Sequence, residues 1–183
     1  MPVSTLALND GTQAPWIAFG TGTALFDKPE DATHAITIAI QNGFTHLDGA
    51  QMYKNETSLG AGIVASGKPR SELYITTRLG PLASGETPKC LLEQSLERLG
   101  VEYVDLYLIH QANQHMGKLK EVWKGMEQAK EAGLTKSIGV SNFTVDHFKD
   151  ILEVATILPA VNQVEIYSFT RSHGSVLHWR GTG

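Results

Sequence analysis

The sequence predicts an α/β fold with a parallel sheet, of the (β/α)₈ barrel type, in which about six of the eight strand–helix units are present. Three observations predict this class. Short apolar runs alternate with helical patterns, the interval between runs is nearly constant, and six such runs can be counted. Alternating strands and helices imply parallel strands joined by right-handed crossovers.

The expected strands are largely apolar throughout instead of strictly alternating. This character is typical of parallel strands that are buried on both faces. The runs are Trp16–Phe19, Thr45–Leu47, Leu73–Thr76, Val104–Ile109, Ser137–Val140 and Ala160–Val164. Before the first run, Asn9-Asp10-Gly11 separates two short apolar stretches, and Asp-Gly in this setting predicts a small N-terminal β-hairpin.

The segments between most of these runs carry apolar residues at helical spacing. Thr87 and Pro88 suit the N-cap and the first position of a helix, and Gly100 suits its C-terminal end. The expected helices are Glu30–Asn42, one that opens at Thr87-Pro88 and ends at Gly100, Lys118–Ala132, and Val145–Ala155.

The competing architecture is an open, doubly wound sheet that binds a dinucleotide. Such a sheet carries Gly-x-Gly-x-x-Gly after its first strand, at the start of a helix. Here Gly20-Thr21-Gly22-Thr23 lacks the third glycine at the required spacing, and no helix is expected to begin there. The rhythm of the chain therefore favours the barrel.

Composition narrows the function classes. The 183 residues carry a net charge of −4 without clusters of Lys or Arg, so we expect no nucleic-acid partner. No apolar run approaches the roughly 20 residues of a membrane span. The single cysteine, Cys90, cannot form an intramolecular disulfide, which favours a reducing compartment. We expect a cytoplasmic protein with no membrane association.

Polar residues close the expected strands, where a barrel places its chemistry. They are Asp48 with Tyr53 in the following loop, Arg78, His110, Ser141 with Asn142, and Gln163 with Glu165. A tyrosine phenol, with a pKa of about 10, becomes a useful general acid near neutral pH when a nearby cation stabilises its anion. A cation held by a carboxylate suits this task, and a neutral imidazole can orient a carbonyl group.

Each of these residues also has an ordinary structural interpretation. Asp48 could cap a helix, Tyr53 could be a half-buried aromatic residue, Arg78 could be a solvated loop cation, and His110 could simply close a strand. It is their combination at neighbouring strand ends that indicates a site.

Four ordered motifs together resemble the aldo-keto reductase family. They are the segment from Phe44 to Glu56 (FTHLDGAQMYKNE), Ser95–His110 (SLERLGVEYVDLYLIH), Lys136–Phe143 (KSIGVSNF) and Pro159–Glu165 (PAVNQVE). The resemblance runs from about Leu6 to Tyr167. We therefore expect an aldo-keto reductase domain at residues 1–167, in a partial barrel, followed by a divergent tail at 168–183.

The resemblance implies an oxidoreductase that reduces aldehydes or ketones to alcohols by hydride transfer from NADPH. Tyr53 would be the general acid, and Asp48, His110 and Arg78 would complete the catalytic set. Gly20, Thr21 and Gly22 would line the cofactor together with Asp48. Ser141, Asn142 and Gln163 would hold the nicotinamide carboxamide, which needs both donors and acceptors. No metal is implied.

Two departures from the family pattern shape the alternatives. Arg78 stands where the family has a catalytic lysine, and a planar guanidinium is not equivalent to an ammonium. After Tyr167 the pattern is lost, so the expected strands would leave open sheet edges through which the protein could self-associate. The alternative function is a catalytically inactive, truncated scaffold. A third alternative is an isomerase or aldolase on a similar barrel. Such an enzyme would often need a phosphate-binding loop after the late strands, and those strands are not expected in this sequence.

Overall fold

The computed structural model describes residues 4–164, which form a two-stranded hairpin and a six-stranded parallel sheet. The hairpin consists of β1 (Thr5–Ala7) and β2 (Gln13–Pro15). The parallel strands are β3 (Ala18–Gly20), β4 (His46–Asp48), β5 (Tyr74–Leu79), β6 (Val104–Ile109), β7 (Thr135–Ser141) and β8 (Asn162–Gln163). Each strand pairs with the next in chain order, without the reversal of a doubly wound sheet. The predicted incomplete barrel with an N-terminal hairpin is confirmed.

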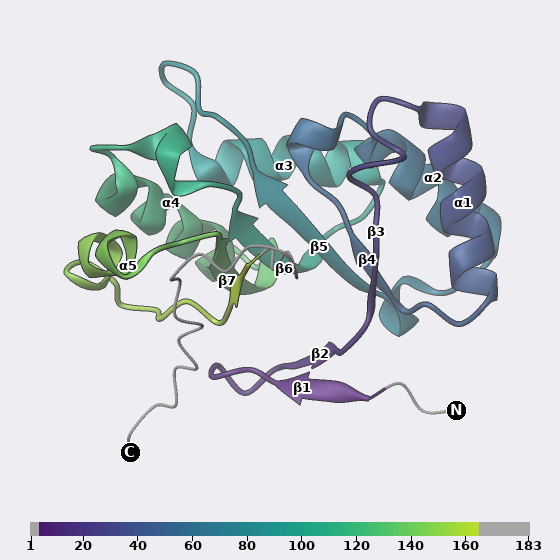
Figure 1. Ribbon diagram of the computed structural model, residues 1–183, viewed down its shortest axis with the longest axis horizontal. Helices are drawn as coiled ribbons and strands as arrows, with labels where there is room; N and C mark the ends of the chain where they lie inside the picture. The colour runs from purple at the N-terminus through teal and green to yellow at the C-terminus, as the bar shows by residue number, and fades with distance from the viewer. Residues whose placement is uncertain (1–3, 165–183) are drawn as a thin grey trace, which may run out of the picture.

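Five α-helices of the described residues connect or follow these strands. They are α1 (Pro29–Gln41), α2 (Glu56–Ser66), α3 (Pro88–Leu99), α4 (Leu119–Glu131) and α5 (Val145–Leu152), with short 3₁₀ turns η1 (Gln51–Tyr53), η2 (Arg70–Glu72) and η3 (Ala112–His115). In Figure 1 the helices form an arc around the sheet from α1 at the right to α5 at the left, and the hairpin lies below. None of these helices is long and apolar enough to cross a membrane.

Side chains alternate between two faces of the strands, as strand geometry requires. On the helical face, Ile75 and Leu79 of β5 join the main core with residues such as Leu92 of α3 and Trp123 of α4. On the opposite face, which we call the inner face, Tyr74 belongs to a smaller apolar cluster that also contains Ala14, Leu106 and Leu108. All residues of β5 and β6 are buried, which explains their apolar runs.

Helix α2 is not predicted by the sequence pattern, and the glycines within α2 explain why. A Cβ atom at Gly60 would lie 2.4 Å from the carbonyl oxygen of Leu99, and one at Gly62 would lie 2.7 Å from Cγ2 of Ile36. Helix α2 therefore packs closely against both α1 and α3. Glycine allows this close approach because it has no side chain, but it also lowers helix propensity. The local sequence of α2 therefore does not indicate a helix.

Some predicted boundaries were wrong. Strand β5 continues to Leu79, because its polar residues Thr77 and Arg78 are buried within the strand instead of ending it. Strand β8 is limited to Asn162–Gln163, and α5 ends at Leu152. Strand β3 begins two residues later than expected, since Trp16 is 63% exposed.

The hairpin is tied to the N-terminal ends of the last strands by polar contacts. Thr12 Oγ1 lies 2.9 Å from Ser137 Oγ, and Asn9 donates to the carbonyl oxygen of Pro159 at 2.9 Å. Asp10 pairs with Lys130 at 3.1 Å. Burial raises the pKa of Asp10, but the hydrogen bonds from Thr12 and Ser137 and the lysine outweigh it and hold the pKa below its usual value.

Candidate active site

The carboxyl ends of the parallel strands surround a cavity of about 230 Å³. Its lining contains nine of the ten residues to which the resemblance assigned a catalytic or cofactor role, all of them except Thr21. The lining residues are Gly20, Gly22, Thr23, Asp48, Tyr53, Arg78, His110, Ser141, Asn142, Gln163 and Val164. Glu165, the other strand-end candidate, and the predicted tail at 168–183 lie outside the described residues.

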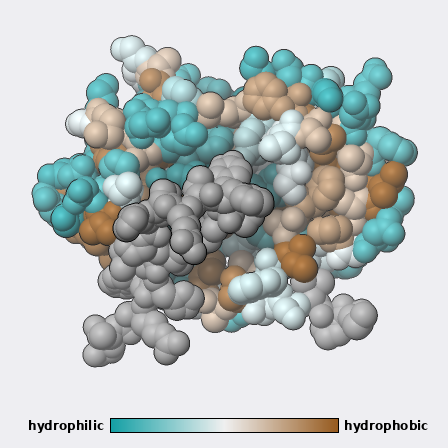
Figure 2. Space-filling view, in the orientation of Figure 1, coloured by the Kyte–Doolittle hydropathy of each residue, from teal (hydrophilic) through white to brown (hydrophobic). Residues whose placement is uncertain are grey.

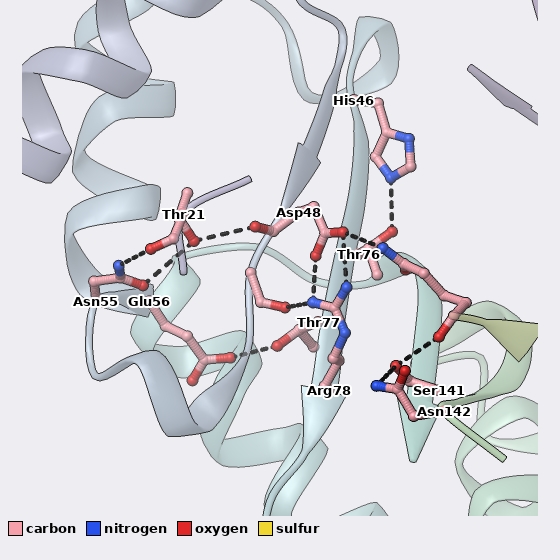
Figure 3. A network of polar contacts seen from close by, with 12 residues as sticks. Thr21, His46, Asp48, Asn55, Glu56, Thr76, Thr77, Arg78, Ser141 and Asn142 are labelled. Atoms are coloured by element: carbon pink, nitrogen blue, oxygen red, sulfur yellow. Dashed lines mark hydrogen bonds and ion pairs between the residues drawn. The ribbon is translucent and has the colours of Figure 1, made fainter. Parts of the chain in front are cut away.

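A buried ion pair forms the floor of the site. Both nitrogens of the Arg78 fork engage the carboxylate of Asp48, with Nη1 on Oδ1 and Nη2 at 2.7 Å from Oδ2. Nη1 also donates to the carbonyl oxygen of Gly49 at 2.7 Å. Figure 3 shows this fork-on-carboxylate arrangement between β4 and β5. Asp48 is therefore not a helix cap and Arg78 is not a solvated cation, because both side chains are about nine-tenths buried or more.

Tyr53 and His110 lie together above this pair. Their ring centroids are 5.6 Å apart with an edge-to-face angle of 85°. The guanidinium carbon of Arg78 lies 5.9 Å from the centroid of the Tyr53 ring. Tyr53 ends η1, and Lys54, in the left-handed conformation with φ of 57°, turns the chain into α2. A phenol, an imidazole and a charge-balanced guanidinium thus share one cavity.

The ends of β7 and β8 supply the amide side of the cavity. Gln163 donates from Nε2 to Oδ2 of Asp48 at 2.8 Å. Its backbone carbonyl accepts hydrogen bonds from Ser141 Oγ at 2.9 Å and from the backbone N–H of Asn142 at 3.0 Å. Asn142 has a positive φ of 55°, which is uncommon for a residue other than glycine and often marks a functional position.

Thr21 does not line the cavity, although the resemblance implied a cofactor contact there. It is fully buried, and its backbone N–H and hydroxyl both donate to the carbonyl oxygen of Asp48, at 2.9 and 3.1 Å. Its own carbonyl accepts from Nδ2 of Asn55 at 2.7 Å. Thr21 therefore holds the loop after β3 against the wall of the site.

Two residues that support the site were given no role by the sequence analysis. Asn55 is 1% exposed and its side chain donates to the carbonyls of Thr21 and Leu25. Glu56 is 2% exposed and accepts from Thr77 Oγ1 and Arg98 Nε, each at 2.7 Å. Their only local signal was their position directly after Tyr53 in the Tyr-x-Asn-Glu motif.

A histidine lies below the site on the inner face. Nδ1 of His46 is 3.2 Å from the carbonyl oxygen of Pro15, so this nitrogen carries the hydrogen, because a carbonyl can only accept. Nε2 lies 2.8 Å from Oγ1 of Thr76 and is left as the acceptor. Burial lowers the pKa of His46, which favours this neutral form. Within residues 4–164, no cluster of His, Cys, Asp and Glu could hold a metal ion.

The fold and the cavity define a class: a parallel barrel-type α/β protein with a polar cavity at the carboxyl ends of its strands. The model of the aldo/keto reductase family matches residues 17–176, and the chain belongs to that family. A glyoxal reductase of Bacillus subtilis (strain 168) is 42% identical over 171 residues, which cover 91% of this chain and 60% of the relative. An aldo-keto reductase of Mycolicibacterium vanbaalenii is 40% identical over 166 residues, which cover 90% of this chain and 58% of the relative.

Solved structures agree with this assignment. The crystal structure of an aldo/keto reductase from Brucella melitensis matches with a TM-score of 0.80 at 33% identity, over 90% of this chain and 64% of that one. A Bombyx mori aldo-keto reductase in complex with NADP matches with a TM-score of 0.78 at 34% identity, over 91% and 59%. The chain spans about 60% of the length of the curated relatives it matches.

Proposed function

We propose that this protein reduces small aldehydes or ketones to alcohols with NADPH, and that Tyr53 donates the proton. The observation that carries the proposal is the buried guanidinium of Arg78, which Asp48 holds in the same cavity as His110 and whose carbon lies 5.9 Å from the Tyr53 ring centroid. A permanent positive charge beside a phenol favours the anion that remains after proton donation.

The amide side of the cavity suits a nicotinamide. A carboxamide both donates and accepts hydrogen bonds, and Ser141, Asn142 and Gln163 offer hydroxyl and amide groups of both kinds at one edge of the cavity. NADPH supplies the hydride in such a reaction. The relative from Bombyx mori was crystallised with NADP, which supports the same cofactor here.

The proton transfer follows from the side chains. As hydride reaches the carbonyl carbon, the substrate oxygen gains negative charge and takes the proton from Oη of Tyr53. The guanidinium of Arg78 stabilises the resulting phenolate, and Asp48 holds that guanidinium in place. His110, edge-on to the Tyr53 ring, orients the carbonyl oxygen toward the phenol. Solvent then returns a proton to Tyr53.

Small polar carbonyl compounds are the first substrates to test. The cavity is small and most of its side chains are polar. The Bacillus subtilis relative, 42% identical, is named a glyoxal reductase, so α-dicarbonyl compounds belong in the first panel.

The test combines cofactor binding with turnover. NADPH would be titrated calorimetrically, and its oxidation would be followed by absorbance with a panel of small aldehydes. Tyr53→Phe should retain NADPH binding and lose turnover by about a hundredfold or more. Tyr103→Phe is the matched control, because Tyr103 lies outside the cavity between Arg70 and Lys136. Equal turnover by Tyr53→Phe and the unaltered protein would exclude the proposed acid.

A second candidate is a cofactor-binding scaffold without turnover. The observation that favours it is the Arg78 fork, whose Nη1 and Nη2 are directed at Asp48 and the Gly49 carbonyl. Saturable NADPH binding without turnover across the panel would support this candidate and refute the reductase.

Self-association through the sheet edges and a cytoplasmic location stay predictions. Trp16 and Ile17, beside β3, are 63% and 60% exposed. Figure 2 shows apolar atoms, in brown, on this face where β2 runs into β3. If the edge mediates association, Trp16→Ser should shift the sedimentation coefficient toward that of a monomer; an unchanged coefficient would exclude this edge as the contact.

A further inference from the structure

The loop after β3 approaches the head of the Tyr53 side chain unusually closely. A Cβ atom placed on Gly22 would lie 3.0 Å from Cζ of Tyr53 and 3.3 Å from both Cε2 and the phenol oxygen. Gly20, two residues earlier at the end of β3 and also in the cavity wall, would place its Cβ in open space. Neither glycine has a positive φ, so backbone conformation does not require glycine at either position.

The loop cannot easily move away from the tyrosine, because Thr21 anchors it. Thr21 is fully buried, and its backbone N–H, hydroxyl and carbonyl groups are all bonded, to the carbonyl of Asp48 and to the side chain of Asn55. Asp48 is itself fixed by the fork of Arg78. Figure 3 shows Thr21 between Asp48 and Asn55. The backbone next to Gly22 is therefore held to the floor of the site.

The same anchor acts on the other side of the contact. Asn55 follows Tyr53 by two residues and is the N-cap residue of α2, and its side-chain amide donates to the carbonyls of Thr21 and Leu25. The loop after β3 and the segment that carries the phenol are thus joined by buried hydrogen bonds. The tyrosine side is also confined, because the Tyr53 ring packs edge-on against His110.

We propose that Gly22 is a positioning residue for Tyr53: its missing side chain leaves the space that the phenol head occupies, and Thr21 and Asn55 hold the two segments at that spacing. This role rests on the proposed function of Tyr53 as the proton donor. It differs from a role in lining the cofactor, because the atoms that a side chain at Gly22 would meet belong to the tyrosine. A methyl group there must push the phenol head aside by a few tenths of an ångström.

The first experiment detects the position of Tyr53 without depending on activity. The chain has five tyrosines, so carbon-13-labelled tyrosine gives few ring signals, and Tyr53→Phe identifies the one from Tyr53. Gly22→Ala should shift the Tyr53 signal, and Gly20→Ala should leave it in place. A Tyr53 signal that is unchanged in a folded Gly22→Ala variant would overturn the proposal.

The second experiment measures the consequence for turnover. Gly22→Ala should lower kcat about tenfold to a hundredfold at saturating NADPH, because a misplaced acid loses its alignment with the substrate. In the Tyr53→Phe background the same substitution should cause no further loss of kcat. A loss of NADPH affinity with kcat retained would assign Gly22 to the cofactor and overturn the proposal. If the unaltered protein has no turnover, the proposed function fails, and the ring signal still decides the positioning role.

Thr21→Val provides a variant that adds no atom near Tyr53. It keeps the shape of the side chain and removes the hydroxyl that donates to the Asp48 carbonyl. We expect the Tyr53 signal to broaden or shift and kcat to fall while NADPH binding persists, since Thr21 does not line the cavity. Should Gly22→Ala fail to fold, a Tyr53 signal unaltered by Thr21→Val would contradict the proposed anchor.

Discussion

Asp48 and Gln163 are hydrogen-bonded to each other from strands that are not neighbours: Nε2 of Gln163 lies 2.8 Å from Oδ2 of Asp48. Three strands separate β4 from β8 in the sheet order. With about 4.8 Å between neighbouring strands, a flat sheet would place β4 and β8 roughly 19 Å apart. The bond therefore requires a strongly curved sheet, whose concave side is the inner face. Six strands already enclose one polar cavity.

Removing this cross-sheet bond should weaken both the fold and the site. Gln163→Leu leaves the buried Asp48 carboxylate with one donor fewer, which should cost about 1–2 kcal/mol in the free energy of unfolding and weaken NADPH binding. Urea denaturation and calorimetric titration measure the two effects. Gln128→Leu is the control, because Gln128 is exposed on α4. Equal unfolding midpoints for the two variants would show that the bond contributes nothing.

Arg78→Lys should increase turnover, although it should lower stability. A lysine ammonium is a compact charge on a flexible stem and can approach the phenol more closely than a guanidinium held on Asp48 and Gly49. We expect kcat to rise severalfold and the free energy of unfolding to fall by about 1–2 kcal/mol, because the paired fork is lost. Arg98→Lys, outside the cavity, should leave kcat unchanged.

Arg78→Met distinguishes charge from packing at the same position. It leaves Asp48 buried without its cation, which should cost about 3–5 kcal/mol in the free energy of unfolding.

For Arg78→Lys, a folded variant that binds NADPH and shows no gain in kcat would contradict the view that Arg78 limits the chemical step.

Acidification should destabilise the fold through buried histidines. Burial lowers the pKa of His46 and of His115 from the ordinary value of 6.5. Below that value the unfolded chain binds more protons than the folded one, so these two histidines stabilise the fold fully above about pH 6.5, and their contribution to the free energy of unfolding is lost as the pH falls. Urea denaturation between about pH 7.5 and 5 measures this loss. His46→Gln should flatten the profile; an unchanged slope would exclude His46 as a contributor.

Gly60→Ala should destabilise the protein, against the usual trend for a helix. An alanine in a helix is ordinarily about 1 kcal/mol more favourable than a glycine. Here the added Cβ would lie 2.4 Å from the Leu99 carbonyl oxygen, so α2 and α3 must move apart, at about 1–3 kcal/mol. Thermal unfolding measures the change. Val64→Ala, at a position that is 79% exposed on α2, should stay within about 0.5 kcal/mol of the unaltered protein.

Several elements were predictable because their causes lie within a few residues. The hydroxyl of Thr87 accepts from the backbone N–H of Cys90, and Gly100 adopts φ of 67° after Leu99, as capping rules predict. Strand β6 has the predicted bounds, since its buried run needs no information beyond its own residues. Because a barrel gathers its polar site residues at the carboxyl ends of its strands, the sequence also predicted that Asp48, Arg78 and His110 lie in one cavity.

The sequence by itself determined the order of the strands and of the helices other than α2, the family, and the edge of the sheet where polar residues gather, because periodicity, caps and motifs are local. Only the tertiary structure decided what those residues touch. The Gln163–Asp48 bond joins positions 115 residues apart, and Thr21 faces Asp48 and Asn55 instead of the cavity. Such contacts depend on the curvature of the sheet and on the close packing of α2, which arise from summed long-range packing and leave no local pattern.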